Sequence, residues 1–120
     1  MVIYKEMKYT TEKTIELLAE GNMLGLQYYI VSYGTHPCCY IKIPEGHELF
    51  GIDYWDIEDV YCHGGLTFSS HRLLADMEEG WYIGWDYNHY GDCNGKTDPY
   101  GRKYSVSMLI ADVTETICDL

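Results

Sequence analysis

The sequence has little that would place it in or across a membrane. It has no run of about 18 apolar residues, the length that a membrane-spanning helix needs. Its first residues, MVIYKEMKYTTEK, lack the apolar core of a signal peptide. We therefore expect neither a membrane span nor a secreted product, and we expect the chain to work in the cytoplasm.

Basic residues are also scarce. Eight Lys and Arg stand against 19 Asp and Glu, which gives a formal net charge of −11 at pH 7. Such a charge repels nucleic acids and anionic membranes, so neither is an expected partner. The segment 45–59 contains acidic residues and no Lys or Arg. An acidic segment of this kind favours association with a basic protein surface.

The cysteines do not form a C-x-x-C pair. There are five, an odd number, and without a signal peptide this favours reduced thiols over a disulfide framework. The pairs Cys62-His63 and His89…Cys93 would supply two thiols and two imidazoles, but their spacing is not that of an ordinary zinc site. We predict buried, unreactive cysteines, no metal ion and no cofactor.

No linker, repeat or low-complexity tract divides the 120 residues, so we predict one α+β domain over residues 1–120. Residues 11–20 have helical spacing of apolar residues, with Thr10 or Thr11 as a cap and Gly21 as a stop. A second helix is predicted from Ser105 to the C-terminus, where Val106, Leu109, Ile110, Val113 and Ile117 recur at helical spacing. The Thr and Val content of this segment leaves a strand at its start as the alternative.

Between these helices the sequence favours short strands. Aromatic and β-branched residues predict strands over 25–33, 38–43 and 81–87, and two strand-like pieces within 60–69. We predict a turn at 34–37, mostly loop over 44–59 with a short helical turn at 54–57, and a polar loop or a single helical turn over 71–80. The predicted fold is an antiparallel sheet of four to five strands with N- and C-terminal helices packed on one face.

The first motif is CHGGLTFS, residues 62–69. The two glycines allow positive φ angles and bring backbone N–H groups close to a ligand, which suits a phosphate or a carboxylate without any basic side chain. A β-bulge or a tight turn, where Gly is needed for steric reasons, is the alternative interpretation.

The second motif is GWDYNHYGD, residues 84–92, at the end of a predicted strand. Asp86 and Asn88 would share one face of the strand, and Trp85, Tyr87 and His89 the other. A carboxylate in an apolar strand needs a partner, and His63 is the partner that we predict for Asp86. A satisfied Asp–His pair in the core, without chemistry, is the alternative.

Thirteen Tyr and three Trp exceed what a small core can hold without stranded polar groups. Some of these rings are expected to line a groove for a planar ligand, or else a wet surface or a contact between copies of the chain. Lys96, Arg102 and Lys103 are candidates to close over an anion, although solubility alone accounts for each of them.

Three ordered blocks carry a resemblance: IPEGHELFGIDY at 43–54, HGGLTFS at 63–69 and WYIGWDYNHYGD at 81–92. They resemble a family of small bacteriophage and prophage proteins of unassigned function. Members show P-x-G-H-P-L-Y-G, H-G-G-L-T-Y/F and W-x-x-G-F-D-C-x-H-x-G-D. The chain departs at Glu48, where Pro is usual, and at Trp85 and Tyr87, where Phe and Cys are usual. The resemblance implies the cytoplasm of an infected bacterial host, and the missing Cys argues against thiol chemistry.

These features together favour a binding protein that sequesters a small, planar, nucleotide-derived immune signal of the host. We predict no catalytic residue, and the predicted ligand contacts are His63, Gly64, Gly65, Thr67, Trp85, Asp86, His89 and Asp92. Two alternatives remain. One is an acidic inhibitor of a host defence protein, and the other is a hydrolase of phosphate or glycosidic bonds that uses His63 or His89 with Asp86 or Asp92. Ser69-Ser70 lacks the G-x-S-x-G context of a nucleophile. A homo-oligomer that completes the groove is also possible.

Overall fold

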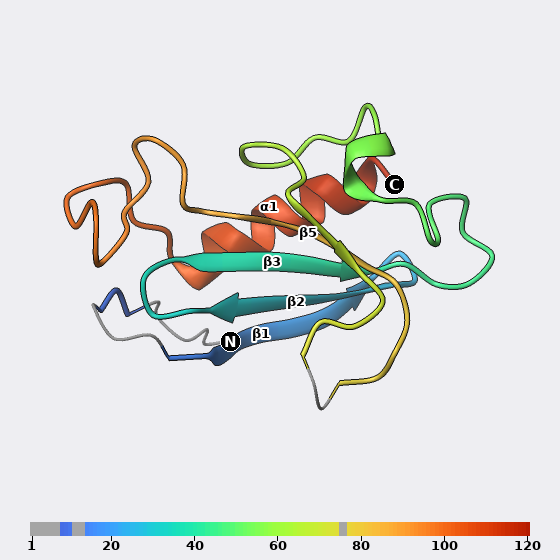
Figure 1. Ribbon diagram of the computed structural model, residues 1–120, viewed down its shortest axis with the longest axis horizontal. Helices are drawn as coiled ribbons and strands as arrows, with labels where there is room; N and C mark the ends of the chain where they lie inside the picture. The colour runs from blue at the N-terminus through green and yellow to red at the C-terminus, as the bar shows by residue number, and fades with distance from the viewer. Residues whose placement is uncertain (1–7, 11–13, 75–76) are drawn as a thin grey trace.

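The computed structural model describes residues 8–10, 14–74 and 77–120. Its centre is an antiparallel sheet of five strands in the order β1-β2-β3-β5-β4 (Figure 1). The sheet and one C-terminal α-helix, within the described residues, confirm an α+β architecture. The elements in chain order are β1 (Glu16–Met23), β2 (Leu26–Ser32), β3 (Pro37–Lys42), the 3-10 helix η1 (Tyr54–Asp56), β4 (Phe68–Ser70), β5 (Tyr82–Asp86) and α1 (Val106–Cys118).

The strands β2 and β3 form the predicted hairpin around residues 33–36. Their register pairs Ile30 with Cys39 and Tyr28 with Ile41, and Tyr33 N–H donates to His36 O at 3.1 Å to close the turn. Ile30, Cys39 and Ile41 are fully buried, because both faces of this hairpin are covered. Aromatic and β-branched residues suit such a position, which explains why the prediction is confirmed here.

The predicted N-terminal helix over 11–20 is wrong where the structure describes it. Residues 16–20 belong to β1, which pairs antiparallel with β2, and residues 11–13 lie outside the described residues. A register irregularity between Leu17 and Ala19 disturbs the alternation of buried and exposed side chains, so the sequence resembles a helical face. The chain turns at Leu24 and Gly25, and Gly25 was predicted as the first residue of a strand. Leu24 and Gly25 both have positive φ, as a two-residue hairpin requires, so Gly21 is not a helix stop.

The strand predicted over 81–87 is confirmed as β5, which lies between β3 and β4. Gly84 is required there, because a Cβ at this position would lie 2.5 Å from Cys39 O and 2.5 Å from Tyr40 Cδ1. Of the two strand-like pieces predicted within 60–69, residues 68–69 begin β4, whereas residues 60–62 are in no strand. The helical turn predicted at 54–57 is confirmed as η1.

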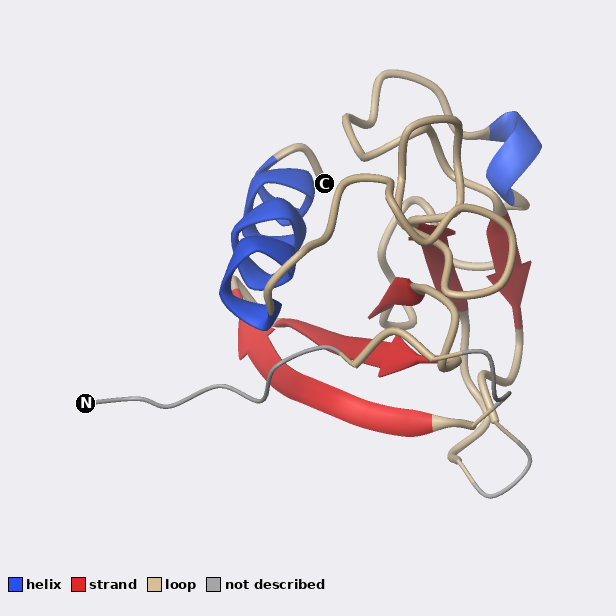
Figure 2. Cartoon of the chain, turned by 90° about the vertical axis from the view of Figure 1, so that its left-hand side faces the viewer, coloured by secondary structure: helices blue, strands red, loops and turns tan. Residues whose placement is uncertain are grey.

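The C-terminal helix begins where the sequence predicted it. The Ser105 hydroxyl accepts a hydrogen bond from Met108 N–H at 3.3 Å, so Ser105 is the N-cap. The helix packs against one face of the sheet, on the side of β1 and β2 (Figure 2). Its buried residues are Val106, Leu109, Val113, Thr116 and Ile117. They meet a core that includes Leu18, Leu26, Ile30, Cys39, Ile41, Ile43, Ile83, Trp85, Tyr87 and Tyr104.

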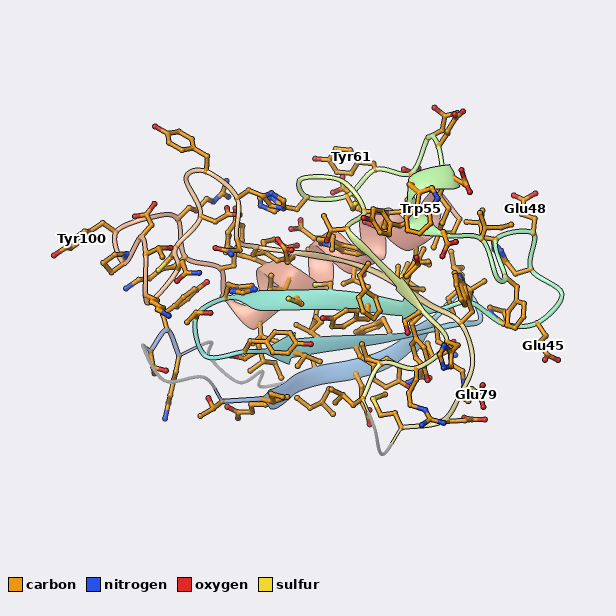
Figure 3. The ribbon with its side chains drawn as sticks, in the orientation of Figure 1. Glu45, Glu48, Trp55, Tyr61, Glu79 and Tyr100 are labelled. Atoms are coloured by element: carbon orange, nitrogen blue, oxygen red, sulfur yellow. The ribbon has the colours of Figure 1, made fainter. Side chains whose placement is uncertain are left out.

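Long loops extend beyond the strands at the two ends of the sheet. Glu45, Glu48 and Trp55 project from the loop 44–59, at the opposite end of the molecule from Tyr100 (Figure 3). The predicted acidic segment is therefore largely a solvent-exposed loop. Within the described residues, α1 is too short and too polar to cross a membrane.

Candidate functional site

The centre of the site is a pair formed by His63 and Asp92. His63 lies in the loop between η1 and β4, and Asp92 lies in the loop that follows β5. His63 Nε2 is 2.7 Å from Asp92 Oδ2, and the side chains are 27% and 5% exposed. Two loops far apart in the sequence therefore meet through one short polar contact.

Asp92 is held by two further donors. His89 N–H donates to Oδ2 at 3.1 Å, and the Tyr104 hydroxyl donates to Oδ1 at 3.0 Å. Burial disfavours the charged carboxylate, but the hydrogen bonds from His63, His89 and Tyr104 outweigh it and hold the pKa of Asp92 below its ordinary value. Burial and the contact with Asp92 raise the pKa of Tyr104 to about 12. Asp92 is therefore an anion, and Tyr104 a neutral donor, at neutral pH.

The predicted partner of His63 was Asp86, and this assignment is wrong. Strand β5 ends at Asp86, and the next residues form turns, with Asn88 N–H donating to Asp86 Oδ1 at 3.2 Å and Asp92 N–H donating to His89 O at 2.9 Å. The second turn brings the carboxylate of Asp92 to Nε2 of His63. The strand alternation used in the prediction does not continue past Asp86, and this explains the error.

The imidazole of His63 is fixed by aromatic rings. It stacks on Tyr87 with a centroid distance of 4.4 Å and an interplanar angle of 11°. The edges of Tyr104 and His89 complete the packing, with ring centroids 5.4 Å and 5.5 Å from that of His63. Its other nitrogen, Nδ1, has no hydrogen-bond partner among the residues that the structure describes. The pair therefore presents one nitrogen of an oriented imidazole that is open to a ligand.

Tyr87 connects the pair to the helix. Its hydroxyl donates to Asp112 Oδ2 of α1 at 2.6 Å and accepts from Trp85 Nε1 at 3.2 Å. Burial raises the pKa of Tyr87, so its hydroxyl stays protonated and keeps donating. Trp85, a predicted ligand contact, is only 1% exposed and lies in the core. Its role in the site is to donate a hydrogen bond to the Tyr87 hydroxyl.

Gly64 and Gly65 shape the loop that carries His63. Gly65 N–H donates to Cys62 O at 3.2 Å, which makes residues 62–65 a turn with positive φ at its third residue, Gly64. A Cβ at Gly64 would overlap His89 Nε2, so Gly is needed there for close approach as well. The turn, which was the alternative interpretation of the glycine pair, is present. Because Gly65 N–H is used in it, the pair does not offer both N–H groups to an anion.

His89 and Asp86, two further predicted ligand contacts, lie close to each other beside the His63–Asp92 pair. His89 Nε2 is 3.2 Å from Asp86 Oδ1, but the nitrogen is buried and the geometry is not that of a hydrogen bond. Thr67 Oγ1 donates to Asp86 Oδ2 at 3.4 Å. The structure thus joins His63, Asp92, His89, Asp86, Thr67 and Gly64 in one contiguous network.

A cavity of about 280 Å³ opens beside His63, between its loop and α1. It is lined by Tyr61, Cys62, His63, Arg102, Tyr104, Met108, Asp112 and Thr116. Of the predicted ligand contacts, His63 alone is in this lining. The guanidinium of Arg102, one of the predicted anion contacts, lies over the ring of Tyr104 at 5.2 Å from the centroid. Tyr61 lies at the outer surface of its loop, where Figure 3 labels it.

The structure adds residues that the sequence analysis did not select. Tyr104, Asp112 and Tyr61 were outside both motifs, and each contributes to the pair or to the cavity. The sequence does mark Asp112 in one way. It is a carboxylate between Leu109 and Val113, beside the apolar stripe of the predicted helix. A charge at that position needs a partner or a ligand.

The thiols near the site are not activated. Burial raises the pKa of Cys62 to about 11 and that of Cys38 to about 12, so neither is a thiolate at neutral pH. Among the described residues, no group of three or more His, Cys, Asp or Glu side chains is placed to hold a metal ion. The site therefore offers an imidazole, carboxylates, a guanidinium and phenol rings.

Comparisons of the chain with protein-family models, with curated proteins and with solved structures gave no match. The function is accordingly argued from the geometry of the site.

Proposed function

We propose that the protein binds a small, planar, anionic ligand in the cavity between the His63 loop and α1. One observation carries the proposal. An imidazole oriented by Asp92 and the guanidinium of Arg102 line the same 280 Å³ cavity, with the phenol rings of Tyr61 and Tyr104 beside them. Most of this lining is polar, and convergent polar groups of this kind fix the orientation of a ligand in small-molecule sites.

The chemistry of the lining favours a nucleotide-derived ligand. Arg102 suits a phosphate, and His63 Nδ1 accepts or donates a hydrogen bond according to its protonation. Flat rings suit a nucleobase. The phage-like blocks support a setting in the cytoplasm of an infected bacterial host. A ligand of this kind in that setting is an immune signal of the host, which the protein would hold and withdraw.

Capture and cleavage are separated by one experiment. The protein is incubated with cyclic dinucleotides or with cyclic ADP-ribose isomers, the mixture is filtered, and the retained protein is heated to release the ligand for chromatography. We expect depletion of one ligand class from the filtrate and its intact recovery after heating. If no probe is depleted, the proposal is wrong and a protein target is favoured.

Two histidine variants, one in the cavity lining and one outside it, give a matched comparison in this assay. His63→Ala removes the imidazole that lines the cavity, and we expect it to abolish depletion. His71→Ala changes an exposed histidine that does not line the cavity, so it should deplete the probe as the parent protein does. Equal depletion by both variants would contradict the assignment of the cavity. Circular dichroism of both variants shows whether each is folded.

The His63–Asp92 pair also favours a second candidate function, acid–base hydrolysis of a phosphate or glycosidic bond. A carboxylate that orients an imidazole with one free nitrogen is the arrangement that general base catalysis needs. In this case, the heated sample contains new products in place of the added probe. Loss of product formation in Asp92→Asn, with probe binding retained, would favour this candidate over capture.

A further inference from the structure

We infer that Asp112 selects the ligand, by accepting hydrogen bonds from a neutral donor group and by excluding a second phosphate. The inference rests on the proposed function and deepens it, because it names the ligand class as a nucleoside monophosphate unit. Asp112 belongs to neither sequence motif, and it lines the cavity from the helix side.

The position of Asp112 leaves one carboxylate oxygen available. Tyr87 donates to Oδ2 at 2.6 Å, and Oδ1 has no partner among the residues that the structure describes. The side chain is half-buried at the edge of the stripe formed by Leu109 and Val113. A carboxylate held at one oxygen has a defined direction, and its other oxygen can accept from a ligand hydroxyl or amino group.

Arg102 and Asp112 carry opposite charges and line one cavity, but they are not paired with each other. Within the described part of the chain, no carboxylate forms an ion pair with Arg102, and no cation forms one with Asp112. Each is therefore free to meet a ligand group of its own. An anion is attracted at Arg102, and a donor such as a ribose hydroxyl or a base amino group is attracted at Asp112.

The same arrangement argues against polyphosphates. A second phosphate that reached Asp112 would meet a like charge in a partly desolvated cavity, which costs affinity and so gives specificity. The cavity volume of about 280 Å³ lies just below the range of about 300–1,000 Å³ that is usual for small-molecule sites. It matches a single nucleoside unit, either free or as one half of a larger molecule.

The test uses three probes, which are adenosine 5′-monophosphate (AMP), adenosine triphosphate and inorganic phosphate, titrated calorimetrically at pH 7. We expect the parent protein to bind the monophosphate most tightly. Asp112→Asn keeps an acceptor for Tyr87 but removes the charge, and we expect it to weaken AMP binding by about tenfold or more. The same variant should bind the triphosphate more tightly than the parent. Glu115→Gln removes an exposed charge of the same helix outside the cavity lining and should change neither affinity.

A second variant separates ligand contact from structural support. Tyr87→Phe removes the hydrogen bond to Asp112 but leaves the carboxylate, so it should keep the preference for the monophosphate over the triphosphate. If Tyr87→Phe loses this preference as Asp112→Asn does, Asp112 acts only through Tyr87 and the inference is overturned. An unchanged preference in Asp112→Asn overturns it too. If none of the three probes binds although a cyclic dinucleotide or a cyclic ADP-ribose isomer is depleted, the inference is overturned and the proposed function stands. If none of them binds and no cyclic probe is depleted, both fail.

Discussion

Replacement of Asp92 by Asn tests the centre of the site most directly, because it keeps the shape of the side chain and removes its charge. Oδ2 accepts two hydrogen bonds, from His63 Nε2 and from His89 N–H, and Oδ1 accepts one from Tyr104. In the variant, the amide oxygen can replace Oδ2, and the Tyr104 hydroxyl can turn to accept from the amide nitrogen. All three contacts therefore survive geometrically, without charge assistance.

The expected loss of stability in Asp92→Asn follows from these contacts. A hydrogen bond to a charged group contributes about 1.5–3 kcal/mol and a neutral one about 0.5–1.5 kcal/mol. The difference is about 1–1.5 kcal/mol per bond, so the two bonds at Oδ2 sum to about 2–3 kcal/mol in the free energy of unfolding. Urea denaturation at pH 7 measures it, and Asp56→Asn, an exposed residue of η1, is the matched control with an expected change within about 0.5 kcal/mol.

The difference in the free energy of unfolding between the parent protein and Asp92→Asn also depends on pH, and this gives a second check. The pKa of Asp92 is lowered in the folded state, so its charge stabilises the fold at pH values above the ordinary Asp pKa of about 4. That stabilisation is lost as the pH falls through the lowered value. The gap between parent and Asp92→Asn should be constant above about pH 5 and should narrow below about pH 4. A gap below 0.5 kcal/mol at pH 7, or one that does not narrow in acid, would refute the reasoning.

Two other changes test the surroundings of the pair. Gly64→Ala places a Cβ against His89 at a positive φ, whereas Gly65→Ala has positive φ with open space around it. Both should lose about 1 kcal/mol of stability to backbone strain, and Gly64→Ala should lose clearly more by urea denaturation; equal losses would mean that the ring of His89 moves freely. Alkylation with iodoacetamide at pH 8, followed by mass spectrometry, should modify the exposed Cys118 well before Cys62, because burial raises the pKa of Cys62 to about 11. Equal rates at the two cysteines would contradict a half-buried, protonated Cys62.

The elements that could be predicted are those in which the local sequence pattern agrees with the burial of the element in the fold. The hairpin of β2 and β3 is rich in β-branched and aromatic residues and is covered on both faces, and α1 has a serine cap before a regular apolar stripe. Strand β1 was not predictable in this way. Its Glu-Leu-Leu-Ala segment favours a helix locally, and its pairing with β2, a contact between different segments of the chain, determines the strand.

The site was predictable in its residues but not in its pairing. The two motifs contain His63, Gly64, Asp86, His89 and Asp92, and the structure brings all of these together. Which carboxylate reaches His63 depends on the turns after β5, and a strand pattern does not extend into turns. Tyr104 and Asp112 join the site through the packing of α1 on the sheet, for which short-range spacing carries no signal.

The negative charge of the chain limits the way in which an anionic ligand would be held. At −11 the protein repels anions at long range, but at physiological salt this repulsion falls off over about 8 Å. The ligand then responds to the nearest groups, and at the cavity these include Arg102, stacked on Tyr104, and the imidazole of His63. Asp92 is also near, but its oxygens already accept hydrogen bonds from His63, His89 and Tyr104, so it acts on a ligand through His63. The carboxylate in the lining with an oxygen free to contact a ligand is that of Asp112. On our proposal, affinity for a phosphate and discrimination against a second one belong to different side chains of one cavity.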